Sequence, residues 1–227
     1  MKKAFTMIEL IFIIVVVGIL AAVAIPRIDR DNLIELVDQV ATHIRYTQQL
    51  AMMDNVYDGS DEHWYRGYWR IQFSDSADGG DGWKYSVYKD LPGYSEREVA
   101  RDPQNEQRFL TSGASGFSAN TDSKKMNKKL NLKNTYDIQK IDFGKNCGGQ
   151  TIAFDSKGRP HGAPQNAKNP YDKVLHTPCI ITFTDSGGRS IQIAVQPETG
   201  FISDNRAEAI EKNWKAGNFK KFDNKEF

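Results

Sequence analysis

The sequence begins with an apolar stretch that has the length of a membrane span and contains a single charge. Residues 5–25 occupy 21 positions, about 30 Å as an α-helix, which matches the hydrocarbon thickness of a bilayer. Lys2 and Lys3 precede it, and the positive-inside rule keeps such a short basic end in the cytoplasm. The chain after Ile25 is therefore expected across the membrane. The one charged residue in the stretch is Glu9.

Three interpretations of this segment differ in how they account for Glu9. A secretory signal peptide would be cleaved near the small residues of positions 20–24, and a plain signal anchor would keep the whole segment. Neither accounts for a carboxylate whose insertion costs at least about 2.5 to 3.5 kcal/mol. In the third interpretation a leader of residues 1–4 is removed, so Glu9 lies one helical turn from the new amino terminus at Phe5. The carboxylate then pairs with the terminal amine of a neighbouring copy.

The segment AFTMIELIFIIVVVGILAAVAIP resembles the amino-terminal motif of type IV pilins and type II secretion pseudopilins. The resemblance implies that a prepilin peptidase cleaves between Ala4 and Phe5 and N-methylates Phe5. It also implies that Glu9 serves filament assembly. The family usually has glycine before the cleavage site, whereas this chain has Ala4, a departure that bears on the efficiency of processing.

The helical pattern continues beyond the apolar stretch. Pro26 predicts a kink near Val23–Pro26, and one helix is expected from Phe5 to about Met53. Its second half, residues 26–54, is amphipathic. Apolar residues recur there at steps of three and four, at Leu33, Leu36, Val37, Val40, Ala41, Ile44, Ala51 and Met52. This stripe is expected to pack on a globular domain.

Residues 55–206 change to a period of two and predict a periplasmic β-sheet domain. Trp69, Ile71 and Phe73 alternate with polar residues, and a similar run follows after a Ser/Asp/Gly hairpin loop. Further strands are expected at residues 138–143, 151–155, 179–184 and 190–195. A helix followed by an antiparallel sheet is an α+β fold, here of the pilin-like kind.

Two segments lack such a pattern. Residues 92–136 are rich in polar and small residues and are interpreted as a loop insertion, because they contain too few apolar residues for a separate core. Residues 207–227 are interpreted as a C-terminal tail.

A second resemblance lies in the carboxy-terminal half. The segments IAFDSKGRP (residues 152–160) and FTDSGGRSIQIAVQPETGFI (residues 183–202) resemble the H-type minor pseudopilin family, also called GspH/FimT-like. Members of this family pair a strand ending in a Gly-Arg turn with a final hairpin ending in a Thr-Gly step.

The two cysteines, Cys147 and Cys179, are expected to form a disulfide, because this topology places them outside the cytoplasm. The bridge would close a loop of about 33 residues, which the chain-entropy model values at roughly 3 to 4 kcal/mol. No further Cys or His lies at ligand spacing, so no structural metal site is predicted here.

A weaker alternative is a calcium site in the hairpin loop. Asp75, Asp78 and Asp81 lie three residues apart among glycines, and Ca²⁺ prefers such carboxylates. The spacing is not that of an EF-hand and no distant glutamate completes the set. A solvated loop is the preferred interpretation, and no cofactor is predicted.

A basic run offers a second alternative, contact with DNA phosphates. It consists of Lys124, Lys125, Lys128, Lys129 and Lys133. No aromatic residue interleaves with it, and loss of Lys2 and Lys3 with the leader lowers the formal net charge of +1 by two. Nucleic acid is therefore not the preferred partner.

Little in the sequence predicts catalysis. The aromatic cluster WYRGYW (residues 64–69) is interpreted as core packing rather than a stacking site. The histidines are scattered, at His43, His63, His161 and His176, and no nucleophile motif is present. We expect no enzymatic activity.

Together these features predict a minor pseudopilin of a type II secretion system. The expected location is the bacterial inner membrane, crossed once, with the C-terminal domain in the periplasm and incorporation into a filament after processing. The expected partners are other pilins or pseudopilins, the prepilin peptidase, the inner-membrane assembly platform and membrane lipid. The alternative is a minor pilin of a type IV pilus or DNA-uptake system that binds DNA or a surface.

Overall fold

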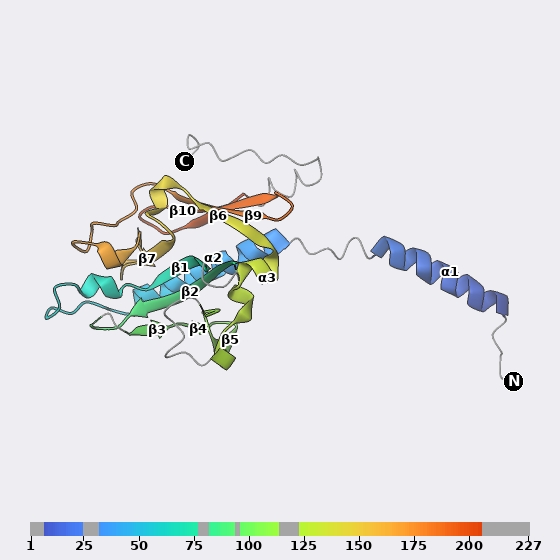
Figure 1. Ribbon diagram of the computed structural model, residues 1–227, viewed down its shortest axis with the longest axis horizontal. Helices are drawn as coiled ribbons and strands as arrows, with labels where there is room; N and C mark the ends of the chain where they lie inside the picture. The colour runs from blue at the N-terminus through green and yellow to red at the C-terminus, as the bar shows by residue number, and fades with distance from the viewer. Residues whose placement is uncertain (1–6, 25–31, 77–81, 94–95, 114–122, 206–227) are drawn as a thin grey trace.

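The computed structural model describes residues 7–24, 32–76, 82–93, 96–113 and 123–205. Figure 1 shows helix α1 (Met7–Ala24) outside the globular domain and helix α2 (Asn32–Met53) within it. The sequence predicts one helix from Phe5 to Met53, and the structure describes two helices over this range. Pro26, where the kink is expected, lies outside the described residues, as does the predicted tail, residues 207–227.

Helix α2 buries the predicted stripe. Seven of its eight members are buried, from Leu33 to Ala51, whereas Met52 is exposed. His43 and Thr47 lie on the same buried face. Helix α2 contacts β1 (Arg70–Ser76) and β7 (Thr151–Phe154) on one side, and β10 (Ser190–Val195) and β11 (Ile202–Asp204) on the other.

The strands form two main antiparallel sheets. The first has the order β3-β2-β1-β7-β8 and adds β2 (Gly82–Asp90), β3 (Arg97–Val99) and β8 (Pro160–His161) to the strands already named. The second has the order β11-β10-β9-β6 and adds β6 (Ile138–Phe143) and β9 (Cys179–Asp185). The α+β expectation of helices followed by antiparallel sheets is confirmed.

Residues 92–136 contain elements that the sequence pattern did not predict. They form β3, the hairpin of β4 (Arg101–Asp102) and β5 (Asn105–Phe109), the short helices η3 (Ser123–Lys125) and η4 (Lys128–Leu130), and α3 (Leu132–Tyr136). Five of their side chains belong to the main core: Ala100, Leu110, Leu130, Leu132 and Tyr136. Single apolar residues at irregular intervals thus attach this segment to the domain.

Two turns, residues 155–159 and 185–189, share the pattern Asp-Ser-x-Gly-Arg and the same hydrogen bonds. In each, the Asp carboxylate accepts from the backbone N–H of the Arg, at 3.0 and 2.9 Å, and from its Nε at 2.8 Å. Each Gly has a positive φ, 77° and 76°, where glycine is favoured. These are the Gly-Arg turns of the second resemblance, and structurally they are a repeat that the sequence analysis did not identify.

The packing of α2 leads to a stability prediction. Leu36→Ala should lower the free energy of unfolding by about 2 to 5 kcal/mol, because Leu36 is fully buried and its truncation leaves a cavity. Urea denaturation followed by tryptophan fluorescence measures this. The matched control is the adjacent exposed residue, Glu35→Ala, expected to change stability by less than about 0.5 kcal/mol. Equal losses for the two variants would contradict the packing.

Candidate functional site

Helix α1 presents apolar side chains on every side. All of its described side chains, residues 7–20, are exposed. Among the large apolar ones the exposed fraction runs from 37% at Val16 to 82% at Met7. Apolar surface of this extent marks a site that another molecule or a membrane covers.

Glu9 lies in the first turn of α1, where a carboxylate interacts favourably with the helix dipole. The predicted cleavage site, Ala4 and Phe5, lies outside the described residues. Within the described residues, no helix meets the length and apolarity needed to cross a membrane.

Cys147 and Cys179 form a disulfide, which confirms the predicted bridge. Their Cα atoms are 4.5 Å apart and both residues are fully buried. Cys147 ends the short helix η5 (Lys145–Cys147), which leads into β7, and Cys179 begins β9. The bond therefore links the segment leading into the five-stranded sheet to the four-stranded sheet.

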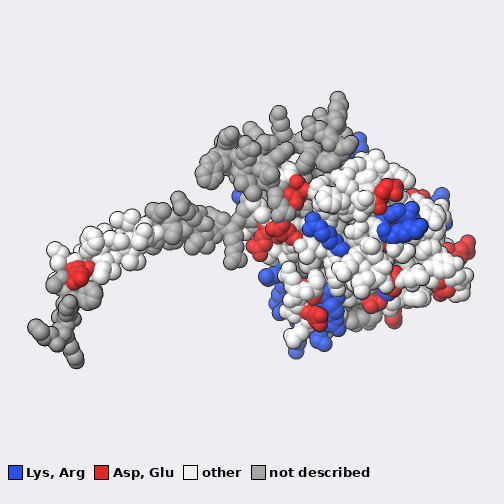
Figure 2. All heavy atoms as spheres, turned by 180° about the vertical axis from the view of Figure 1, so that it is seen from behind, with Lys and Arg blue, Asp and Glu red and all other residues white. Residues whose placement is uncertain are grey.

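The basic run lies on η3, η4 and α3. Lys124, Lys125, Lys128 and Lys129 are exposed, and Lys133 is half-buried. Figure 2 shows positive and negative side chains interspersed over the face drawn, without one continuous basic track. Four lysines of the run are thus accessible to a ligand.

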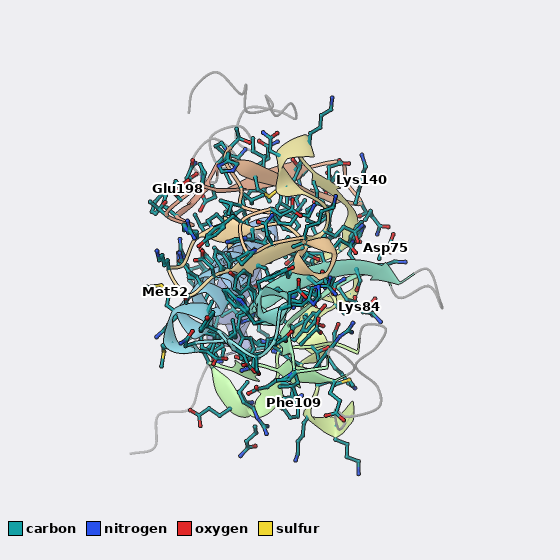
Figure 3. The ribbon with its side chains drawn as sticks, turned by 90° about the vertical axis from the view of Figure 1, so that its left-hand side faces the viewer. Met52, Asp75, Lys84, Phe109, Lys140 and Glu198 are labelled. Atoms are coloured by element: carbon teal, nitrogen blue, oxygen red, sulfur yellow. A yellow bond between two sulfur atoms is a disulfide. The ribbon has the colours of Figure 1, made fainter. Side chains whose placement is uncertain are left out.

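The predicted carboxylate group is only partly described. Asp75 is exposed at the outer end of β1 (Figure 3), whereas Asp78 and Asp81 lie outside the described residues. Among the residues that the structure describes, no group of three or more His, Cys, Asp or Glu is placed to hold a metal ion.

The aromatic cluster contributes mainly to packing, as predicted. Tyr65, Tyr68 and Trp69 are buried. Trp64 is half-buried and meets Tyr57 edge to face, with ring centroids 5.2 Å apart. Both rings line an open cavity of about 510 Å³ beside the end of α2.

A directed chain of hydrogen bonds crosses the interior beneath α2. The Tyr136 hydroxyl donates to Gln39 Oε1 at 2.7 Å, and Gln39 Nε2 donates to the Tyr85 hydroxyl at 2.9 Å. His43 Nδ1 lies 2.7 Å from the Tyr85 hydroxyl and is its one remaining partner among the described residues, so we assign the hydroxyl proton to this bond. Because Nδ1 accepts, the neutral His43 ring carries its proton on Nε2.

Burial keeps His43 neutral. The side chain is 2% exposed, and burial lowers its pKa to about 4, although the charge of Asp102 acts in the opposite direction. The sequence analysis treated His43 as one of several scattered histidines. Its helical spacing from Leu36, Val40 and Thr47 is the signal that would have placed it on the buried face.

Comparison of the chain with protein-family models, with curated proteins and with solved structures finds no match in any of the three. Its function is therefore inferred from its own residues and their geometry.

The low pKa of His43 predicts a pH dependence of stability. Between the ordinary pKa of 6.5 and the folded pKa of about 4, the unfolded chain binds a proton that the folded chain does not. The free energy of unfolding should therefore fall by about 3 kcal/mol as the pH drops through this window. Urea denaturation at a series of pH values measures the slope.

Two comparisons isolate this effect. The slope should decrease in His43→Gln and stay unchanged in His176→Gln, since His176 is exposed. Burial would raise the pKa of Asp155, but hydrogen bonds from His161 and Arg159 outweigh it and lower this pKa below its ordinary value. Asp155 therefore adds a loss of stability mainly below pH 4. An unchanged slope in His43→Gln would contradict the assignment.

Proposed function

We propose that this chain is a structural subunit, a minor pseudopilin of a periplasmic type II secretion pseudopilus that supports protein secretion. The observation on which the proposal rests is α1, an apolar helix whose described side chains are all exposed and whose first turn contains Glu9. Such a helix requires an apolar environment, and the described part of the chain does not provide one. Inner-membrane lipid supplies it first, and neighbouring subunits supply it in the filament.

The membrane part of the proposal rests on the sequence of residues 5–25, which extends beyond the described part of α1. Prepilin peptidase removes residues 1–4 and methylates Phe5. The carboxylate of Glu9 then has a partner in the assembled state, the terminal amine of an adjacent subunit. The assembly platform transfers the processed subunit from the membrane to the filament.

The rest of the chain supports this role in two ways. Helix α2 packs its apolar stripe on antiparallel sheets, so the chain after α1 forms a folded domain that the filament would carry. The disulfide between Cys147 and Cys179 is of the kind that persists in an oxidising compartment such as the periplasm.

Replacing Glu9 tests the assembly step. Glu9→Gln should be inserted and cleaved between Ala4 and Phe5 like the natural chain, yet be incorporated into filaments at least about tenfold less, because the paired charge is worth more than about 1.4 kcal/mol. Mass spectrometry of the amino terminus measures cleavage and methylation. Quantification of the subunit in sheared filaments measures assembly.

Glu35→Gln is the matched control, since Glu35 lies exposed in the first turn of α2. It should be processed and assembled normally. Retention of residues 1–4 in the mature natural chain would exclude the proposal. Normal assembly of Glu9→Gln would exclude the charge pairing alone.

The second candidate is a minor pilin of a type IV pilus or DNA-uptake system. It is favoured by the exposure of Lys124, Lys125, Lys128 and Lys129. The full chain in detergent should then bind a duplex oligonucleotide with an affinity that falls by about 10²-fold between 50 and 200 mM NaCl, as expected for four phosphate contacts. Fluorescence anisotropy measures this, and absence of binding at low salt would exclude the DNA-binding candidate.

A further inference from the structure

An open polar cavity of about 370 Å³ lies beside α2. Helix α2, the hairpin of β4 and β5, and η4 supply its walls. In Figure 3 the labelled Phe109 marks the end of β5 at the lower edge of the molecule. The cavity is separate from α1 and uses none of the residues assigned to assembly.

A buried donor faces this cavity. The His43 ring lines it and is 2% exposed. Its Nδ1 is occupied by Tyr85, so the remaining polar atom is Nε2, which carries the proton. Within the described part of the chain Nε2 has no protein partner. An N–H group held in this way is a preformed donor toward a ligand in the cavity.

Three cations surround the opening. Arg108, Lys128 and Lys129 line the cavity, and all three are exposed. Arg108 Nη1 donates to the carbonyl of Met126 at 3.0 Å, which holds the guanidinium in place. None of the three forms an ion pair with a carboxylate among the described residues. Their charges are available to a ligand.

One carboxylate also lines the cavity, and it is already satisfied. Asp102 Oδ1 accepts from the backbone N–H of Gln104 at 2.8 Å, and Oδ2 accepts from Asn127 Nδ2 at 2.6 Å. Asp102 is 5% exposed. The three cations outnumber this one carboxylate, so the net charge of the lining is positive. The carboxylate nevertheless disfavours a ligand of high negative charge, such as a phosphate dianion.

We propose that this cavity binds a carboxylate group. The planar carboxylate matches the guanidinium fork of Arg108, the two lysines add charge, and the Nε2–H of His43 donates from the floor. The ligand is either a free carboxylic acid or an acidic side chain of a protein segment, since both present the same group. This inference does not depend on the filament role of α1.

Size and charge distribution favour this ligand over nucleic acid. A cavity of about 370 Å³ has the size of a small-ligand pocket, whereas nucleic acid follows an extended groove. Nucleic acid also requires a continuous basic track, and the lining of this cavity contains Asp102 beside its cations.

The test uses the full chain in detergent micelles, labelled with ¹⁵N at histidine. Acetate, and separately a short peptide with blocked ends that contains one glutamate, is titrated at constant ionic strength against NaCl. Saturable shifts of the His43 Nε2 resonance are expected. Lys128→Gln/Lys129→Gln should weaken binding by about tenfold or more. The probe that binds tighter identifies the source of the carboxylate.

Lys124→Gln/Lys125→Gln is the matched control, because it removes two charges from the same run outside the cavity lining. It should leave the affinity within about twofold. If both double variants weakened binding of the probe equally, the lysines would act only as a general basic patch, and the proposal would be overturned. So would shifts that NaCl reproduces, phosphate binding tighter than acetate, or an oligonucleotide that competes equally well overturn it.

Discussion

Burial of one face of α2 is the constraint on which the globular domain depends. The stripe touches β1 and β7 of one sheet and β10 and β11 of the other, so both sheets are built around the same helix. Two glutamines fix its position. Gln39 belongs to the hydrogen-bonded chain that ends at His43, and Gln48 Nε2 donates to the carbonyls of Gly158 and Thr199, each at 2.8 Å. Apolar burial and directional bonds together give the helix one register.

Much of this arrangement could be predicted, because the physical signal is local. Strands β6 and β10 have the predicted boundaries, since each is a short run rich in β-branched and aromatic residues that turn residues flank. The stripe of α2 follows from helical spacing alone. The disulfide between Cys147 and Cys179 follows from the count of two cysteines and the predicted compartment.

The remainder depends on contacts between distant segments. Alternation assigns Arg70 to the face opposite the core, yet it is fully buried, with Nη1 3.1 Å from Asp90 Oδ2, and Arg97 Nε lies 3.3 Å from the same carboxylate. Alternation predicts which residues are buried only where one face of a strand meets water. Here other segments of the chain cover both faces of the strand. The cavity beside His43 is likewise formed by segments about sixty and eighty-five residues apart along the chain, a separation over which no local pattern extends.

The two helices divide the apolar surface of the chain between folding and assembly. The stripe of α2 is covered by its own domain, whereas the described side chains of α1 are exposed. In the proposed filament, Glu9 favours the transfer of α1 from membrane lipid to the neighbouring subunits. A charged carboxylate in lipid costs at least about 2.5 kcal/mol, and the terminal amine of an adjacent subunit offsets part of that cost in the assembled state. In this proposal the same residue therefore favours incorporation of the subunit into the filament.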